Sequence, residues 1–342
     1  MADVLFEVRG FAGLITLNRP QALNALNRSM CLAIHAQLDA WATDDAVRLV
    51  IIAGAGDRAF CAGGDVVAVA RAGQAGSDEW EGFFADEYRM NHAIATYPKP
   101  YVALVGGIVM GGGVGLSIHA PFRIANEKTL FAMPETGIGL LPDVGGTHAL
   151  PRLPGEIGVF AGLTGARFGP GDCIWAGIAT HCVPSDQTEA LVAALTSGEE
   201  VAAALARFAR EAGESPLSAH SDAIDFHFAH DRVEDIQQSL AAGDAWALAQ
   251  HDTIARMSPT SCKLTLRALR EGAFLDIADA LVNEYRVVCG IKHGKDFYEG
   301  IRAQLVDKDR NPKWMPASLA EVSDSDVSRY FVEPTGGDLV FG

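Results

Sequence analysis

The sequence predicts an α/β protein with a helical C-terminal region. Strand-like and helix-like segments alternate in the first half, and helix-forming residues dominate the remainder. The alternation begins at residues 4–18, where two β-prone runs around Gly10 predict a hairpin. A helix is expected from Asn27, because apolar side chains then recur at steps of three and four residues: Met30, Ile34, Leu38 and Trp41. A buried strand follows at residues 48–53.

The same order of elements recurs in the middle of the chain. Residues 101–105 predict a second buried strand, which leads through a glycine-rich turn into an apolar helix from about Gly112. Further β-prone runs lie near residues 121–125 and 130–132. We therefore expect a core in which strands alternate with helices.

The composition changes after about Ser185, where alanine, leucine and glutamate predict helices, with a break at residues 213–216. The chain has 342 residues, of which 49% are hydrophobic, which is enough for a large core and two structural units. We therefore divide it into a core at residues 1–210, which carries the ligand site, and a helical C-terminal region at residues 211–342.

Charge and hydropathy exclude two classes of partner. The formal net charge is −16 and no basic run is present, so nucleic acid is not an expected ligand. The apolar stretch from Tyr101 to Ala120 has the length of a membrane span, but it contains six glycines and lacks anchoring features. We expect no membrane partner.

The six cysteines lack CxxC spacing, which predicts buried thiols in a reducing compartment and no zinc or other metal site. The first ten residues lack the basic patch and apolar run of a signal peptide, and they resemble a strand. These two observations predict a cytoplasmic protein.

Two glycine-rich turns are the main functional signal. Residues 60–65 follow one buried strand, and residues 110–115 follow another, each before an apolar helix. Such turns leave amide N–H groups free and let a ligand approach the backbone closely. Amides around Gly64 and Gly112 would suit the carbonyl oxygen of a thioester, which gains negative charge during reaction. The alternative is that both turns are only tight strand-to-helix connections.

The glycine spacing does not match two other known glycine motifs. A dinucleotide-binding motif would need a third glycine at position 116, where the sequence has Leu116. A serine-hydrolase elbow around Ser117 would need glycine at position 119, where the sequence has His119.

Three acids are candidates for chemistry. Glu135 and Asp143 lie in an apolar segment punctuated by glycine and proline, where the pKa of a carboxyl group is often raised. Each also has a structural interpretation, as a helix first-turn acid or a cap. Glu87 lies on a predicted helix with aromatic neighbours, and by itself it is interpreted as a solvated residue.

The turns and acids occur within a set of motifs that resembles the crotonase (enoyl-CoA hydratase/isomerase) superfamily, namely residues 18–20, 25–27, 60–65, 111–113 and 134–135. Within it the chain is most similar to the 3-hydroxyisobutyryl-CoA hydrolases, through FFxxEY at residues 83–88, PETxIGLxPDVGG at 134–146, SPTS at 258–261 and DFYEGIR at 296–302. The resemblance implies a spiral of ββα repeats followed by a helical region.

The resemblance also implies roles for the two turns. The amides of Gly64 and Gly112 would form an oxyanion hole, and Ala62, Gly63 and Gly64 would line the coenzyme A arm. Hydratases of the superfamily carry a second catalytic glutamate where this chain has Gly115, and they usually carry glycine where it has Asp143. These two differences from the hydratases favour hydrolysis of the thioester over hydration of a double bond.

For a hydrolase the resemblance implies that Glu135 attacks the thioester carbonyl or activates water. Asp143 would position the substrate hydroxyl and assist proton transfer, and Glu87 and Gly112 would also contact the substrate. The substrate would be 3-hydroxyisobutyryl-CoA, from valine catabolism, and coenzyme A would enter only as part of it, with no separate cofactor.

Two alternatives stay open from the sequence. They are an enoyl-CoA hydratase or isomerase and, from another class, a non-catalytic acyl-CoA binding protein. The superfamily resemblance also implies a homo-oligomer, commonly a trimer or hexamer.

Overall fold

The structure is a computed structural model that describes residues 2–341. Contacts group these residues into two compact units whose segments interleave along the chain. Unit 1 contains the residues up to Gly64, Arg89–Ala132 and Arg167–Ala219, and unit 2 contains Asp65–Tyr88, Met133–Ala166 and the residues from His220 onward. This grouping is a different property from the predicted division at residue 210, which stays a prediction about domains.

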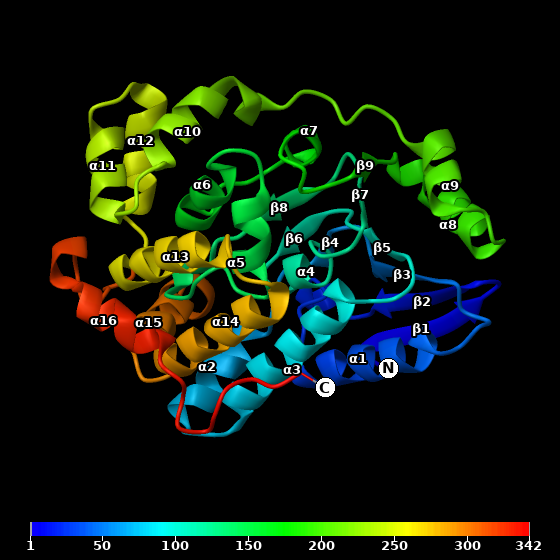
Figure 1. Ribbon diagram of the computed structural model, residues 1–342, viewed down its shortest axis with the longest axis horizontal. Helices are drawn as coiled ribbons and strands as arrows, with labels where there is room; N and C mark the ends of the chain where they lie inside the picture. Colours follow the sequence, from blue (N-terminus) through cyan, green and yellow to red (C-terminus); the bar gives the residue numbers. More distant parts are fainter. Residues whose placement is uncertain (1, 342) are drawn as a thin grey trace. The chain divides into compact units, whose positions relative to one another are not determined.

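Unit 1 is built on a six-stranded sheet (Figure 1). Strands β1 and β2 form the predicted antiparallel hairpin, and each following strand joins in parallel. The order across the sheet is β1 (Val4–Arg9), β2 (Ala12–Leu17), β3 (Leu49–Gly54), β5 (Tyr101–Leu104), β7 (Phe122–Ala125) and β9 (His181–Cys182).

A second sheet of unit 1 has three short parallel strands, β4 (Ala59–Cys61), β6 (Ile108–Met110) and β8 (Leu130–Ala132). Each strand of this sheet follows a strand of the large sheet: β3 precedes β4, β5 precedes β6, and β7 precedes β8. The chain therefore repeats a two-strand step, and the predicted ββα spiral is confirmed.

Helices of unit 1 bury the apolar faces that the sequence indicated. Helix α1 (Arg28–Ala42) begins at Asn27, whose side chain accepts a hydrogen bond from the Met30 amide at 2.9 Å, and its buried residues include Ile34 and Leu38. Helices α8 (Thr188–Thr196) and α9 (Val201–Phe208) contribute Leu191, Leu195 and Leu205 to a core shared with Leu49, Ile51 and Val102 of the sheet. Unit 1 also contains the short helices α4 (Gly112–Gly115) and α7 (Pro170–Trp175).

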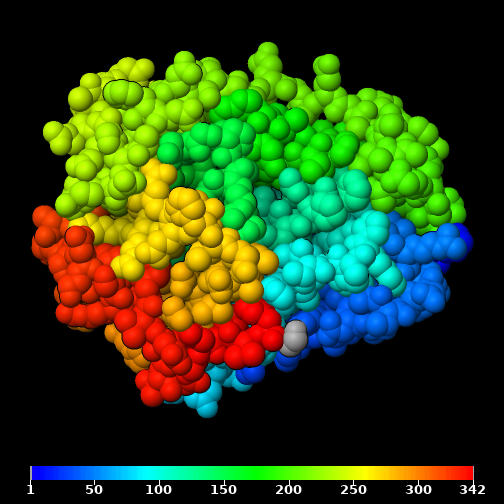
Figure 2. Space-filling view, viewed as in Figure 1, coloured from blue at the N-terminus to red at the C-terminus, as the bar shows by residue number. Residues whose placement is uncertain are grey.

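Unit 2 is helical, and Figure 2 shows its C-terminal segments, coloured yellow, orange and red, packed against one another. Arg286 of α14 (Ile277–Ile291) pairs with Asp338 near the C-terminus at 2.6 Å, which links the last described residues to this helix. The helices are α2 (Val66–Gln74), the first part of α3 (Glu79–Ala95), α5 (Gly146–Ala149), α6 (Ile157–Thr164), α10 (Ser221–Phe228), α11 (Val233–Ala241), α12 (Ala245–Ile254), α13 (Pro259–Gly272), α14 (Ile277–Ile291), α15 (Asp296–Ile301) and α16 (Asp324–Ser328).

The helical character of the C-terminal region is thereby confirmed, and the predicted break lies between the end of α9 at Phe208 and a 3-10 helix that begins at Pro216. The apolar stretch from Tyr101 to Ala120 forms β5, β6 and α4. Within residues 2–341, no helix combines the length and hydropathy needed to cross a membrane.

Candidate active site

The two glycine turns, residues 60–64 and 110–115, lie against each other in unit 1. A Cβ atom placed on Gly113 would lie 2.2 Å from the Cys61 carbonyl oxygen, which is closer than any real contact, so only glycine fits there. A Cβ atom on Gly63 would lie 4.0 Å from the Gly112 amide nitrogen. The structure therefore brings together the turns that the sequence singled out.

Backbone conformation explains why the turns are glycine-rich. Gly63 has φ = +121° and Gly111 has φ = +48°, values that residues with a side chain rarely adopt. Gly112 begins α4, and the first amides of a helix have no partner inside it. Gly64 is held by a parallel bridge to Leu26. The amide of Ala62 differs, because it donates to the Leu23 carbonyl at 3.1 Å.

The predicted acids gather in unit 2. Glu87 comes from α3, Glu135 from the first residue of a 3-10 helix (Glu135–Ile138), and Asp143 from the loop before α5. All three are buried, each with 4% or less of its surface exposed. The interpretation of Glu87 as a solvated residue is therefore wrong, because this side chain is 2% exposed and lies on a helix whose Phe84 and Tyr88 are also buried.

A fourth carboxyl group joins them, that of Glu284 from α14, which is 1% exposed. We call Glu87, Glu135, Asp143 and Glu284 the carboxylate cluster. Burial and the negative charge of Asp143 both raise the pKa of each of the three glutamates, which shows that the members of the cluster interact.

Asp143 is the member with the most nearly ordinary pKa. Burial raises this pKa to about 6, while the Tyr88 hydroxyl, which donates to Oδ2 at 2.7 Å, opposes the rise. Asp143 therefore ionises most readily within the cluster, and its negative charge raises the pKa of the neighbouring glutamates. Tyr88 is a site residue that the sequence reasoning quoted only as part of a motif.

The carboxyl groups of Glu87 and Glu135 have raised pKa values, so both bind a proton more strongly than an ordinary glutamate does. Burial is the main cause that raises the pKa of both carboxyl groups well above the usual range, and the charge of Asp143 adds to it. One oxygen of each, Oε1 of Glu87 and Oε2 of Glu135, is buried without a hydrogen-bond partner among the described residues. Such groups can accept or donate a proton or attack a reacting atom.

Glu284 was missed by the sequence reasoning, although a signal was present. The apolar face of α14 runs through Leu281, Val287 and Val288 at helical spacing, and Glu284 lies on that face. Its carboxylate accepts hydrogen bonds from the Gly145 amide, the Thr147 amide and the Thr147 hydroxyl. Burial raises the pKa of Glu284 to about 8, against the effect of these donors.

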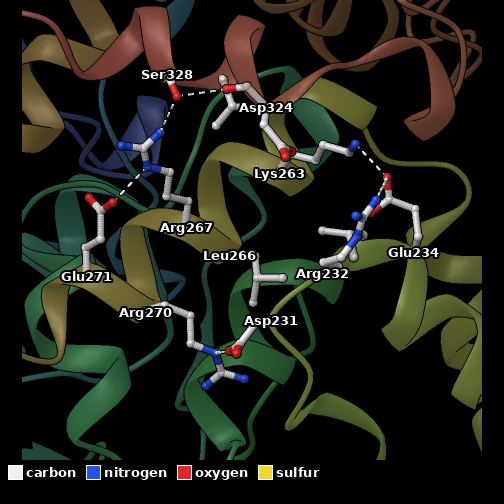
Figure 3. A pocket seen from close by; sticks show the side chains of 12 residues that line it. Asp231, Arg232, Glu234, Lys263, Leu266, Arg267, Arg270, Glu271, Asp324 and Ser328 are labelled. Carbon is white, nitrogen blue, oxygen red and sulfur yellow. Dashed lines mark hydrogen bonds and ion pairs between the residues drawn. The ribbon is translucent and has the colours of Figure 1, made fainter.

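A cavity of unit 2 lies away from the carboxylate cluster and is lined by different side chains (Figure 3). Its volume is about 380 Å³, and side chains of α11, α13 and α16 line it. Three cations of α13 already pair with acids: Lys263 with Glu234 at 2.6 Å, Arg267 with Glu271 at 2.8 Å, and Arg270 with Asp231 at 3.3 Å. These pairs neutralise the lining, so the cavity does not offer the charge that a coenzyme A phosphate needs.

No metal site competes with this interpretation in the described part of the chain. Among residues 2–341, no group of three or more histidine, cysteine, aspartate or glutamate side chains is arranged to hold a metal ion.

The sequence comparisons with known proteins agree on one family. The sequence model of the family described as enoyl-CoA hydratase/isomerase matches residues 12–331. The mitochondrial 3-hydroxyisobutyryl-CoA hydrolase of Danio rerio is 50% identical, and the alignment covers 99% of this chain and 91% of that protein. The human protein of the same name is 45% identical, with the same coverage.

Two solved structures are similar over almost the whole chain. The structure of a carnitinyl-CoA dehydratase from Mycobacterium thermoresistibile has a TM-score of 0.95 and 46% identity, and covers 100% of this chain and 99% of its own. The structure of an enoyl-CoA hydratase from Rhodobacter sphaeroides has a TM-score of 0.92 and 43% identity, with 99% and 100% covered. The predicted superfamily and fold are confirmed.

The expectation of a cytoplasmic protein is wrong, because the curated relatives at 45–50% identity carry the name of mitochondrial proteins. The six cysteines are buried, as expected, and form no disulfide bond among the described residues. Free thiols indicate a reducing compartment, and this property does not distinguish the cytosol from the mitochondrial matrix.

Proposed function

The chain belongs to the enoyl-CoA hydratase/isomerase family, and within it we propose that this protein hydrolyses the thioester of 3-hydroxyisobutyryl-CoA, a step of valine catabolism. The names of the curated relatives at 45–50% identity support this activity. The names of the two similar structures describe a dehydratase and a hydratase. The residues of this chain must therefore decide the reaction.

The observation that carries the proposal is the carboxylate cluster. Glu135 has a buried, unpartnered oxygen and interacts electrostatically with Asp143. At position 115, where the family resemblance implies a glutamate in hydratases, the buried Gly115 of α4 offers no acid. A reaction that needs two glutamates on one water is therefore disfavoured, whereas one nucleophilic carboxylate with a neighbouring acid suits hydrolysis.

We assign the chemical steps as follows. In one route the Glu135 carboxylate attacks the thioester carbonyl carbon, the carbon–sulfur bond breaks and the thiol leaves with a proton, and water then hydrolyses the anhydride between Glu135 and the acyl group, which restores the carboxylate. In the other route Glu135 removes a proton from a water that attacks the carbonyl carbon, and the carbon–sulfur bond breaks as the thiol leaves with a proton. Asp143 holds the β-hydroxyl of the substrate and transfers that proton. Water supplies the oxygen and hydrogen of the products, a carboxylic acid and a thiol.

The amides of Gly64 and Gly112 have the proposed role of oxyanion-hole donors. Removal of one such donor typically costs about 2.7–4 kcal/mol of transition-state stabilisation. Gly63 and Gly64 would let the coenzyme A arm approach the backbone, and Ala62 would contribute its carbonyl, because its amide is already engaged. Glu87 and Gly112 would contact the acyl group.

The decisive experiment measures thiol release from 3-hydroxyisobutyryl-CoA and hydration of crotonyl-CoA by the same preparation. The proposal predicts release of coenzyme A and little hydration. Hydration of crotonyl-CoA without release of coenzyme A from 3-hydroxyisobutyryl-CoA would replace the proposal with the hydratase alternative. Binding of acyl-CoA without either reaction would favour the non-catalytic alternative.

The proposed chemistry needs no separate cofactor, because carboxylate groups and water balance the reaction. Dialysis against EDTA should therefore leave the hydrolysis rate unchanged. We also propose a homo-oligomer, trimeric or hexameric as in the family resemblance, and light scattering of the purified protein tests this.

A further inference from the structure

The loop that carries Asp143 has an unusual backbone. Val144 has φ = +55° and Gly145 has φ = +80°. A β-branched residue in the left-handed region costs on the order of 1–3 kcal/mol and persists only when its surroundings enforce it. Val144 is 1% exposed, so packing contributes to this constraint.

Glu284 supplies a second constraint from a distant part of unit 2. Its Oε2 accepts from the Gly145 amide at 2.8 Å, and its Oε1 accepts from the Thr147 amide at 3.0 Å and the Thr147 hydroxyl at 2.5 Å. These donors lie at the start of α5, whose first amides have no partner inside the helix. Glu284 therefore caps α5 with a side chain that comes from α14.

The Asp143 carboxyl group is held at the same time. Tyr88 donates to its Oδ2, and the Asp143 carbonyl accepts from the Gly146 amide at 2.7 Å. The direction of the Asp143 side chain therefore depends on the loop that Glu284 fastens. A carboxylate buried at this position needs a reason, because burial of charge is costly unless hydrogen bonds compensate it.

We propose that Glu284 and Thr147 are positioning residues for the reaction, because together they fix the loop that directs the Asp143 carboxyl group. The inference rests on the proposed function, in which Asp143 acts on the substrate. The titratable groups that interact with Glu284 are Glu87 and Tyr88 of α3 and Asp143 of the loop. Glu284 thus contacts the loop directly and acts on the substrate only through its neighbours.

The test uses paired variants of the full chain. Thr147→Val removes the hydroxyl donor and keeps the shape of the side chain, and Thr147→Ser keeps the hydroxyl. Glu284→Gln removes the charge and turns one acceptor into a donor. Asp279→Asn is the control, because it removes an exposed carboxylate from the same helix.

Two measurements are made on each variant: hydrogen exchange of residues 143–149, and kcat with KM for thioester hydrolysis. We expect faster exchange in Thr147→Val and Glu284→Gln, a fall in kcat on the order of 10- to 100-fold, and KM within about two-fold. Thr147→Ser should restore kcat and slow exchange, and the control should match the wild type. If Glu284→Gln does not fold, the Thr147 pair gives the answer.

The outcomes separate the inference from the function on which it rests. If hydrogen exchange of residues 143–149 is the same in Thr147→Val as in the wild type, the inference is overturned, whatever the activity of the variant. Faster exchange with unchanged kcat, in a protein that Asp143→Asn inactivates, also overturns it and leaves the proposed function intact. An active Asp143→Asn variant would instead refute the proposed role of Asp143 itself.

Discussion

The glycine turns of unit 1 and the carboxylate cluster of unit 2 are built in different ways. The turns are made of backbone, and the residues within each turn are neighbours along the chain: the positive φ values of Gly63 and Gly111 are local requirements, whereas Gly113 is needed where the two turns meet. The cluster is made of side chains from α3, a 3-10 helix, a loop and α14. In the proposed function, the turns hold the carbonyl group of the substrate and the cluster carries out the reaction.

The largest expected effect is that of Glu135→Gln. Loss of the attacking or proton-accepting carboxylate should lower kcat by about 10²–10⁴-fold, while acyl-CoA binding is largely kept. Coenzyme A release measures the first quantity, and titration calorimetry with a substrate analogue measures the second. Unchanged turnover per folded molecule would mean that the cluster does not determine the reaction.

The glycine turns are tested by Gly113→Ala. Its Cβ atom would meet the Cys61 carbonyl oxygen at 2.2 Å, so the turns must move apart. We expect a loss of about 1–3 kcal/mol in the free energy of unfolding and a loss of hydrolysis and of acyl-CoA binding together. Gly336→Ala is the matched control, because a Cβ atom there meets no other atom within 4 Å. If Gly113→Ala binds and hydrolyses normally, the turns are only connections.

The cluster should also make stability depend on pH. In the folded state the pKa of Asp143 is raised to about 6 and that of Glu284 to about 8, so folding favours the protonated acids. Their contribution to stability is present below the ordinary carboxyl pKa and is lost as pH rises through 6 and 8. For Asp143 the loss is on the order of 3 kcal/mol, at about 1.4 kcal/mol per pKa unit.

Glu87→Gln isolates this effect, because it replaces a buried acid of raised pKa by a neutral group of the same size. Urea unfolding at several pH values should show that the variant gains stability relative to the wild type as pH rises from 5 to 9. A difference that stays constant over this range would show that folding does not raise the pKa of Glu87. The glycine turns contain no ionisable side chain apart from the buried Cys61, so they add little to this dependence.

The contrast also explains what the sequence could predict. Strand alternation and glycine spacing are local patterns, so the glycines of residues 60–65 and 110–115 were identified as turn residues, although the structure assigns Phe60 and Cys61 to β4 and Met110 to β6. Glu135 and Asp143 were found because they interrupt an apolar segment. Glu284 is separated from Gly145 by 139 residues, and only the tertiary packing of α14 brings the two together.

Glu87 and the interleaved units show the same limit. A helix with aromatic neighbours does not reveal which face is covered, so Glu87 was interpreted as solvated, although the structure buries it. Each compact unit is formed by three separate segments of the chain, which is a property that no local sequence pattern indicates; the predicted division at residue 210 concerns domains and stays a prediction. Contacts between distant segments are not encoded in any window of ten or twenty residues.

The smallest expected effect is that of Tyr88→Phe, which removes the hydroxyl that donates to Asp143 at 2.7 Å. That hydrogen bond lowers the pKa of Asp143, so its loss should raise this pKa further above 6. Asp143 should then keep its proton to a higher pH. Because the proposed reaction uses that proton for the leaving thiol, the fall of kcat/KM with rising pH should move to higher pH, with about a five-fold increase in rate near neutrality. Tyr97→Phe is the control. It removes another partly buried hydroxyl, which donates to the Leu38 carbonyl of α1 in unit 1, and it should leave the pH profile of kcat/KM unchanged. A profile that Tyr88→Phe does not move would show that Asp143 does not set the pH dependence, and would reduce the cluster to the two glutamates with unpartnered oxygens.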